Sequence, residues 1–534
     1  MELENKVLQP NEQEKAPSCL PLTKRDTVFA IGALVVTLFL SLFGLFSSFS
    51  LGYLLASTFM IILFAIYFAK GGKLAFSPIL CGLLALANGA IFICTTNGSV
   101  RFFGFVVGFL LSLVCFDGLV NGASKGNRQT IGILYSAVSS IRNVALSVKS
   151  LFAGRDGNKK VFGKAVVGLI CAIPVLLVVV PLLISSDAAF KGMMSNIFSN
   201  TSTSFLKIIF ALLICPFVIS YGFSLKSGKI AKIKKGKFSG IENTYLISFL
   251  SAISVCYLLY LFSQLAYFFS AFKGFLPNGE ITYAQYARKG FFEMCVIAVI
   301  NLIIVFLALL LAKKKKGKVC HSIKAIATFI SLFTLIIIAT AISKMVLYID
   351  AYGMTVLRIT TSAFMLFLSV VFISVILRIY IKKINIVKTA LITAGFIILI
   401  LGTVNVNGVC ARYNYESYQT NRLKTIDTRA LYNLGDEGIP YLIKLTEAEE
   451  LDVAKDARRF LGRAYLFDYF DNMESVDGFT VEDLKANQRS KGFEYFNLPK
   501  ARAYKCLYEY IESDPWIGQN CREFFWDSAY NEYY

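Results

Sequence analysis

The chain is poor in the residues on which much enzyme chemistry depends. Its 534 residues include one histidine, His321, and two tryptophans. His321 lies in the basic segment 313–324, which the topology derived below assigns to the inner membrane face. A Ser-His-Asp triad or a histidine metal site on the outer face is therefore excluded. The chain also contains no Walker-type phosphate loop and no dinucleotide fingerprint, which argues against an ATP-driven pump within it. We predict no metal and no cofactor.

Charged residues are also scarce, at 16% of the chain, while hydrophobic residues make up 56% and the mean hydropathy is +0.62. A chain of this composition is not an ordinary soluble globule. Its hydrophobic residues collect in runs that are long enough to cross a bilayer as helices. We predict an all-α, polytopic membrane bundle with eleven spans, near residues 27–46, 51–69, 75–95, 102–116, 165–185, 205–225, 245–265, 291–312, 325–343, 359–377 and 389–407.

Basic residues collect in alternate gaps between these runs. The gaps after the second, fourth, sixth, eighth and tenth spans hold 2, 8, 6, 6 and 4 of them, and the gaps after the odd-numbered spans hold 0, 1, 1, 3 and 2. Basic loops stay in the cytoplasm, so we expect the N-terminus inside and the C-terminus outside. The net charge of +20 then follows from topology and from contact with anionic lipid at the inner face. No basic patch is combined with a nucleic-acid-binding module, so we predict no nucleic-acid partner.

Three regions follow from this pattern. Residues 1–26 form a polar cytoplasmic tail that we expect to be disordered, and residues 27–410 form the membrane domain. Residues 411–534 carry 16 basic and 22 acidic side chains and form a small extracytoplasmic domain. Its cap signals predict helices near 447–466, 480–489 and 498–513, the first opened by Thr446 with Glu449 and the last by Asn497 with Pro499.

The inner segment between the fourth and fifth spans has a helical pattern of its own, near residues 128–152. Apolar residues recur there at steps of three and four, at Ile131, Leu134, Val138, Ile141, Ala145, Val148 and Phe152. Basic residues occupy other positions of this segment, and no acidic residue occurs between Asp117 and Asp156. The pattern predicts either an amphipathic helix on the inner leaflet or a helix packed against the bundle.

Polar side chains gather at the predicted outer ends of the fifth and the seventh to tenth spans. Glu293 and Arg358 each lie about one turn inside a span, and an unpaired charge there is costly, so we expect them to form an ion pair with Lys289 and Lys344 nearby. The set can be structural, because such residues anchor helices at the headgroups, or it can bind a ligand. Its members are Asp187, Gln264, Tyr283, Tyr286, Arg288, Lys289, Glu293, Lys344, Tyr348, Asp350, Tyr352 and Arg358.

The cysteines follow the same division of the chain. Most of the twelve lie in or beside hydrophobic spans or in inner segments, where cysteine acts as a small apolar residue. Cys506 and Cys521 lie well inside the exported region, so a disulfide between them is a candidate.

Four segments resemble a known family. They are SSDAAF, YAQYARKGFFE, LYIDAYGMTVLR and ARYN, within residues 165–450. They are similar to segments of bacterial multi-pass membrane proteins described as domain of unknown function 4173, which is related to 4153. The spans before residue 165 carry no comparable signature. The resemblance implies a shared membrane architecture in a bacterial cell membrane and carries no activity.

These observations favour a non-enzymatic envelope sensor or assembly component that uses its outer face. The exported domain would bind an envelope partner or ligand, and the basic inner face would contact lipid. An alternative is a transporter of a small solute or lipid through the bundle. A membrane-embedded transferase would need Asp187, Glu293 and Asp350 as its acid, base or metal ligands, because the predicted first outer loop, residues 47–50, contains no carboxylate.

Overall fold

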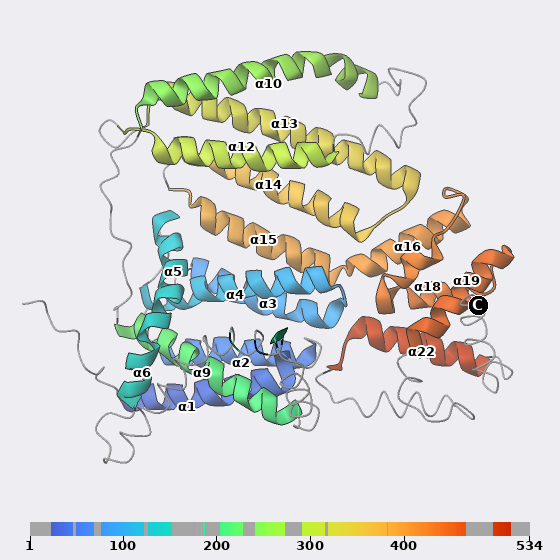
Figure 1. Ribbon diagram of the computed structural model, residues 1–534, viewed down its shortest axis with the longest axis horizontal. Helices are drawn as coiled ribbons and strands as arrows, with labels where there is room; N and C mark the ends of the chain where they lie inside the picture. The colour runs from blue at the N-terminus through green and yellow to red at the C-terminus, as the bar shows by residue number, and fades with distance from the viewer. Residues whose placement is uncertain are drawn as a thin grey trace, which may run out of the picture. The chain divides into compact units, whose positions relative to one another are not determined.

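The computed structural model is mostly helical where it is described, and no β-strand occurs in that part of the chain (Figure 1). This confirms the predicted all-α class. The structure describes isolated positions between 179 and 186 and ten continuous ranges, which are residues 23–45, 50–68, 76–121, 127–151, 203–227, 241–272, 291–314, 319–381, 383–465 and 495–513.

Eleven helices of the described residues are long and apolar enough to cross a membrane. Ten of them coincide with predicted spans. The eleventh is Thr130–Val148, the segment that we expected near the inner surface. The predicted span 165–185 lies outside the described residues, apart from isolated positions. The short predicted span 102–116 belongs to a longer helix, α4 (Gly98–Asn121). Its ends contain Arg101 and Asp117, which bond locally, so neither residue ends the helix.

The chain divides into two compact units, each described by itself. The first unit comprises residues 1–42, 59–71 and 135–232. It contains α1 (Lys24–Phe39), α6 (Val144–Leu151), α9 (Thr203–Ser227), the 3₁₀ turn η2 (Ile141–Asn143) and parts of α2 (Leu51–Phe68) and α5 (Asn127–Ser140). Phe29 of α1 is buried there among aromatic rings, stacked on Tyr67 at 4.0 Å and edge-on to Phe64 at 5.2 Å. These contacts pack α1 and α2 together in this unit.

The second unit holds the remaining spans, arranged as a row in which each helix contacts the next (Figure 1). α13 contacts α10, α12 and α14, and α15 contacts α14, α3 and α4. The bounds of these helices are α3 Phe76–Cys94, α10 Asn243–Phe272, α12 Phe291–Leu311, α13 His321–Tyr352, α14 Val356–Tyr380 and α15 Ile386–Thr403.

Glycines allow three of these helices to approach closely. A Cβ placed on Gly402 of α15 would lie 2.3 Å from a side-chain atom of Ile91 on α3, and one on Gly395 would lie 2.9 Å from Leu111 on α4. In a bilayer the hydrophobic effect does not drive helices together, because lipid tails are as apolar as the helix surfaces. Helices associate there through close packing, which small residues permit. The contact of α15 with α3 and α4 therefore depends on glycine at these two positions.

The C-terminal helices form their own apolar core at one end of α3, α14 and α15 (Figure 1). They are α16 (Val406–Gln419), α17 (Thr428–Tyr432), η3 (Gly435–Glu437), α18 (Ile439–Leu445), α19 (Leu451–Tyr465) and α22 (Leu498–Ser513). The expected helical character is present, and the predicted domain boundary at residue 410 falls inside α16.

Two predicted cap signals have different outcomes. Asn497 caps α22, because its side-chain oxygen accepts a hydrogen bond from the Lys500 N–H at 3.2 Å. The predicted Thr446–Glu449 capping box is wrong, since α19 begins only at Leu451. The Thr446 hydroxyl instead donates to the Ile443 carbonyl at the end of α18. A threonine can form either this bond or an N-cap, and the sequence pattern is the same in both cases. The predicted helix 480–489 lies outside the described residues.

Candidate functional site

Buried polar side chains of the C-terminal helices hold the turn between α3 and α4. Glu437 of η3 is 5% exposed. Its carboxylate accepts one hydrogen bond from the Thr96 N–H at 3.0 Å and a second from the Thr96 hydroxyl. Arg101 donates to the Thr95 carbonyl at 2.7 Å, and its charge interacts with that of Glu437. The carboxylate therefore satisfies backbone and side-chain donors of a turn 341 residues away in sequence.

Two asparagines complete this contact. Asn497 donates to the carbonyl oxygens of Phe92 and Thr95, at 3.2 and 3.4 Å. Asn407 of α16 accepts from the Asn97 amide at 2.8 Å and donates to the Leu434 carbonyl at 2.9 Å. Asn497 is 4% exposed, so its bonds replace water at the carbonyls where α3 ends. Asn407 is 6% exposed and links the Asn97 side chain to the Leu434 carbonyl.

α16 also forms hydrogen bonds to the turn between α13 and α14. Asn414 accepts from the Met354 N–H at 2.7 Å and donates to the Met354 carbonyl at 2.8 Å. Gly353 adopts φ +78° in this turn, and a Cβ there would lie 2.7 Å from the Asn414 side-chain oxygen, so the position requires glycine. We call the two turns, residues 95–97 and 353–355, together with Asn407, Asn414, Glu437 and Asn497, the turn junction.

Arg358 lies beside the turn junction and caps the end of α13. Its guanidinium donates to the Tyr352 carbonyl at 3.2 Å and to the Gly353 carbonyl, and it lies 4.0 Å from the centre of the Tyr348 ring. Tyr348 and Tyr352 are themselves in edge contact at 5.2 Å. Three members of the predicted polar set are thus brought together.

The predicted ion pair between Glu293 and Arg358 is not formed, although both residues are described. Arg358 is instead engaged with the carbonyls that α13 leaves unbonded, because the tight turn at Gly353 places these groups one helical turn away. Glu293 is exposed in the first turn of α12, and its charge interacts with that of Lys344 on α13, as expected. Asp350 is exposed near the end of α13.

The rest of the predicted set is not described in atomic detail. Gln264 belongs to α10, but its side chain is not described. Cys506 has a free thiol, and its predicted partner Cys521 lies outside the described residues. The other members outside the described residues are Asp187, Tyr283, Tyr286, Arg288 and Lys289. Within the described ranges, no cluster of three or more His, Cys, Asp or Glu side chains could hold a metal ion.

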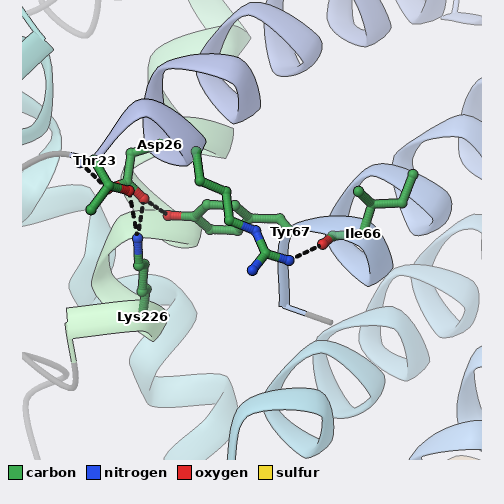
Figure 2. A network of polar contacts seen from close by, with 6 residues as sticks. Thr23, Asp26, Ile66, Tyr67 and Lys226 are labelled. Carbon is green, nitrogen blue, oxygen red and sulfur yellow. Dashed lines mark hydrogen bonds and ion pairs between the residues drawn. The ribbon is translucent and has the colours of Figure 1, made fainter. Parts of the chain in front are cut away.

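A second polar network lies in the first unit, where a buried carboxylate receives hydrogen bonds from several directions (Figure 2). Asp26 of α1 has a side chain that is 3% exposed and pairs with Lys226 of α9 at 2.5 Å. The same carboxylate also accepts hydrogen bonds from the Tyr67 hydroxyl at 2.6 Å and from the Thr23 N–H and hydroxyl at 2.7 and 2.8 Å. The start of α1 is therefore fastened to the ends of α2 and α9.

Neither network has a strong signal in the sequence. The turn at 95–97 is short and uncharged, and Glu437 resembles any other acidic residue of an acidic region. Asp26 and Lys226 are 200 residues apart and flank hydrophobic spans, where charged residues are ordinary. One signal was available: the ARYN and LYIDAYGMTVLR segments, singled out by their resemblance, contain Asn414 and its partner Met354.

Eleven apolar helices and buried polar contacts at the helix ends define an integral, multi-pass membrane protein. A family model described as "Domain of unknown function (DUF4153)" matches residues 58–445, and the chain belongs to this family. No curated protein and no solved structure matches the chain.

The match corrects the expected extent of the resemblance. It begins at residue 58, before α3 and α4, although the spans before residue 165 showed no comparable signature. It ends at residue 445 and so includes Thr96, Asn407, Asn414 and Glu437, whereas Asn497 lies beyond it. Most of the turn junction thus belongs to the matched domain.

Proposed function

We propose that this protein is a non-enzymatic envelope sensor or assembly component whose C-terminal helices bind a ligand or partner. The turn junction carries the proposal, because it joins the C-terminal helices to the ends of two pairs of membrane helices, α3–α4 and α13–α14. A ligand or partner that shifts the C-terminal helices would have to break these contacts or carry the turns along.

The energetics favour the second outcome. Glu437, Asn407 and Asn497 are buried and hydrogen-bonded, and an unsatisfied buried polar group costs about 1–3 kcal/mol. Displacing all three from the turns would exceed what a weak ligand supplies. Movement of the C-terminal helices would therefore be transmitted to the membrane helices.

In this proposal the C-terminal helices and both turns lie outside a bacterial cell membrane, with the N-terminus in the cytoplasm. The alternation of basic gaps supports this arrangement, since both turns follow odd-numbered predicted spans. Glu293, Lys344, Tyr348, Asp350, Tyr352 and Arg358 would then belong to the outer face, available to a ligand or partner. The basic inner face would contact anionic lipid.

Site-specific photo-crosslinking in intact cells tests the proposal. A photoreactive residue replaces the exposed Glu512 on α22, and the captured envelope components are compared between the unaltered junction and Glu437→Ala. We expect a defined adduct that the junction variant changes and that Glu447→Ala, an exposed control, does not. Absence of any adduct at several exposed α22 positions would refute a partner at this surface.

A transporter remains a second candidate because of one polar contact inside the membrane spans. Asn301 of α12 is fully buried; it accepts from the Tyr257 hydroxyl of α10 and donates to the Thr334 hydroxyl of α13 at 2.9 Å. Buried polar groups at this depth can line a pathway or simply join helices. If they line a pathway, Asn301→Leu abolishes solute flux into vesicles while the protein stays folded. Unchanged flux for a broad set of solutes would favour the joining role.

A further inference from the structure

The helical segment 127–151, formed by α5, η2 and α6, has polar residues inside and apolar residues outside. Its buried positions are mostly hydroxyl residues, namely Thr130, Ser136, Ser139, Ser140, Ser147 and Ser150. Its exposed large side chains are Ile131, Tyr135, Val138 and Ile141, at 40%, 40%, 64% and 55%. This reverses the pattern of a helix on a soluble protein, so the exposed face fits an apolar medium.

By composition alone, residues 130–148 are apolar enough to cross a membrane. Its contacts with other helices argue otherwise. Near its start, the Thr130 hydroxyl accepts from the Asn385 amide at 2.6 Å, and Asn385 is the cap at the start of α15. Later in the segment, the Ser220 hydroxyl donates to the Ser140 carbonyl at 2.7 Å, near the end of α9.

Within the first unit, α6 contacts α9 and crosses it instead of running along it (Figure 1). Ser140 and Ser147, two turns apart, both contact Ser220, the second at 3.4 Å between the hydroxyl oxygens. The Asn143 amide also donates to the Ser224 hydroxyl at 3.0 Å. A helix that spans beside α9 would meet successive turns of it, whereas these three bonds all reach Ser220 or Ser224, near the end of α9.

The first unit places the end of α9 beside the start of α1. The Lys226 ammonium, at the end of α9, pairs with Asp26 of α1 at 2.5 Å, and the Tyr67 hydroxyl, near the end of α2, donates to the same carboxylate at 2.6 Å. The contacts of Ser140, Asn143 and Ser147 with α9 therefore lie near the end of that helix, where α1 begins.

We propose that residues 127–151 form an interfacial helix in the plane of the bilayer, on the face where the chain's N-terminus lies, with Ile131, Tyr135, Val138 and Ile141 inserted among anionic lipids. A helix that spans beside α9 would move away from its end along the bilayer normal, whereas Ser140, Asn143 and Ser147 of this segment all bond to Ser220 or Ser224, near the end of α9. Arg142 is exposed beside Ile141, and no acidic residue interrupts the chain between Asp117 and Asp156. Such a surface complements anionic headgroups.

Depth-dependent fluorescence quenching tests the orientation in the full chain. Trp516 and Trp526 are replaced by Phe, and one Trp is introduced at Ile131, Val138 or Ala145, all exposed positions. The protein is placed in phosphatidylcholine–phosphatidylglycerol vesicles with bromine at defined acyl positions. We expect equal, shallow quenching at all three sites, while Ile303→Trp, on the exposed side of the spanning helix α12, is quenched most by deep bromine. Deep quenching at 138 flanked by shallow quenching at 131 and 145 would overturn the proposal, as would no quenching.

The lipid preference has its own arm. Quenching of Val138→Trp by brominated phosphatidylglycerol is compared with that by brominated phosphatidylcholine at equal mole fraction. We expect stronger quenching by the anionic lipid, and Arg142→Gln reduces this preference up to about fivefold, the effect of one basic residue near an anionic surface. Equal quenching by both lipids would refute the anionic preference. An unchanged elution volume of each variant on size exclusion confirms that the fold is retained.

Discussion

Glu437 is the residue on which the α3–α4 turn depends most. Both of its carboxylate oxygens accept from Thr96, once from the backbone and once from the side chain. Buried donors that lack a hydrogen-bond partner destabilise a fold, so this carboxylate stabilises the turn by accepting hydrogen bonds as well as through its charge. Its neighbour in the 3₁₀ turn, Gly435, has φ +72°, which allows η3 to present Glu437 to the turn.

Replacing Glu437 should therefore destabilise the protein more than its charge alone implies. We expect Glu437→Ala to lower the free energy of unfolding by about 2–3 kcal/mol and Glu437→Gln, which retains one acceptor, by less. Denaturant titration in mixed micelles measures both. Glu447→Ala removes the same charge from an exposed site and should stay within about 0.5 kcal/mol of the parent. Equal effects at 437 and 447 would contradict the assigned role.

Two thiols should differ in reactivity. Burial raises the pKa of Cys410 to about 12, so at pH 7–8 it is a neutral, inaccessible thiol. Hydrogen bonding with the Ser322 backbone and hydroxyl lowers the pKa of Cys320 at the start of α13, so its thiolate is more abundant at the same pH. We expect maleimide to label Cys320 rapidly and Cys410 only after unfolding, as peptide mass mapping would show. Labelling of Cys410 in the folded protein would be inconsistent with its packing.

At the scale of helices, the ion pair of Asp26 and Lys226 joins elements whose dipoles favour it. A carboxylate at the start of α1 and an ammonium at the end of α9 each lie where the helix macrodipole stabilises that charge. Arg25 also donates to the Ile66 carbonyl at 2.6 Å, near the end of α2. Three helix ends are thus held by charges of the appropriate sign.

A double-mutant cycle measures the contribution of this pair. Asp26→Asn alone should cost about 2 kcal/mol, below the 3–5 kcal/mol of a fully buried pair because Lys226 is 37% exposed. Adding Lys226→Gln should cost little more, since the partner charge is already gone. Lys24→Gln, an exposed neighbour, serves as the control. Additive effects of the two single changes would show that the residues do not interact.

The surroundings of two glycines, one in α15 and one in α4, predict different effects of replacing each with alanine. Gly402→Ala would place a methyl 2.3 Å from the fully buried Ile91, and overpacking of this kind costs about 1–3 kcal/mol. Gly98→Ala meets nothing within 4 Å at the start of α4, so it should be neutral or slightly stabilising. Unfolding titrations of the two variants under one condition provide the comparison. A neutral Gly402→Ala would mean that α3 and α15 separate easily.

For the whole molecule, the question is which side each end of a helix faces. The C-terminal helices contact the α3–α4 and α13–α14 turns, so these three parts share one side. The segment 319–320 at the start of α13 lies at the other end of that helix. Sidedness can therefore be tested with two native cysteines, Cys320 and Cys506.

An impermeant maleimide applied to intact cells should label Cys506 and not Cys320, with the other cysteines replaced. Permeabilisation should then expose Cys320. This result follows from basic loops being retained in the cytoplasm. Labelling of Cys320 in intact cells would invert the topology while leaving the contacts of the turn junction intact.

The predicted spans agree with the structure wherever both can be compared, because twenty apolar residues in a row have few alternatives to a helix. The predicted Glu293–Arg358 pair is wrong for a local reason. Arg358 donates its hydrogen bonds to the Tyr352 and Gly353 carbonyls at the end of α13, not to Glu293. The predicted stripe at 128–152 is helical as far as residue 151, and its last member, Phe152, lies outside the described residues. Its apolar members, however, divide between an exposed face and a buried one, as at Val138 and Val148.

Composition and periodicity by themselves determined that this is a multi-pass helical membrane protein, with helical C-terminal elements and an alternation of charge that predicts its orientation. Only the tertiary structure decided which polar groups meet. Asp26 with Lys226, Thr96 with Glu437, and Met354 with Asn414 are distant in sequence, and each is an ordinary residue where it stands. Hydrophobicity acts on each segment alone, whereas a buried hydrogen bond needs two partners, and the folded chain selects the second.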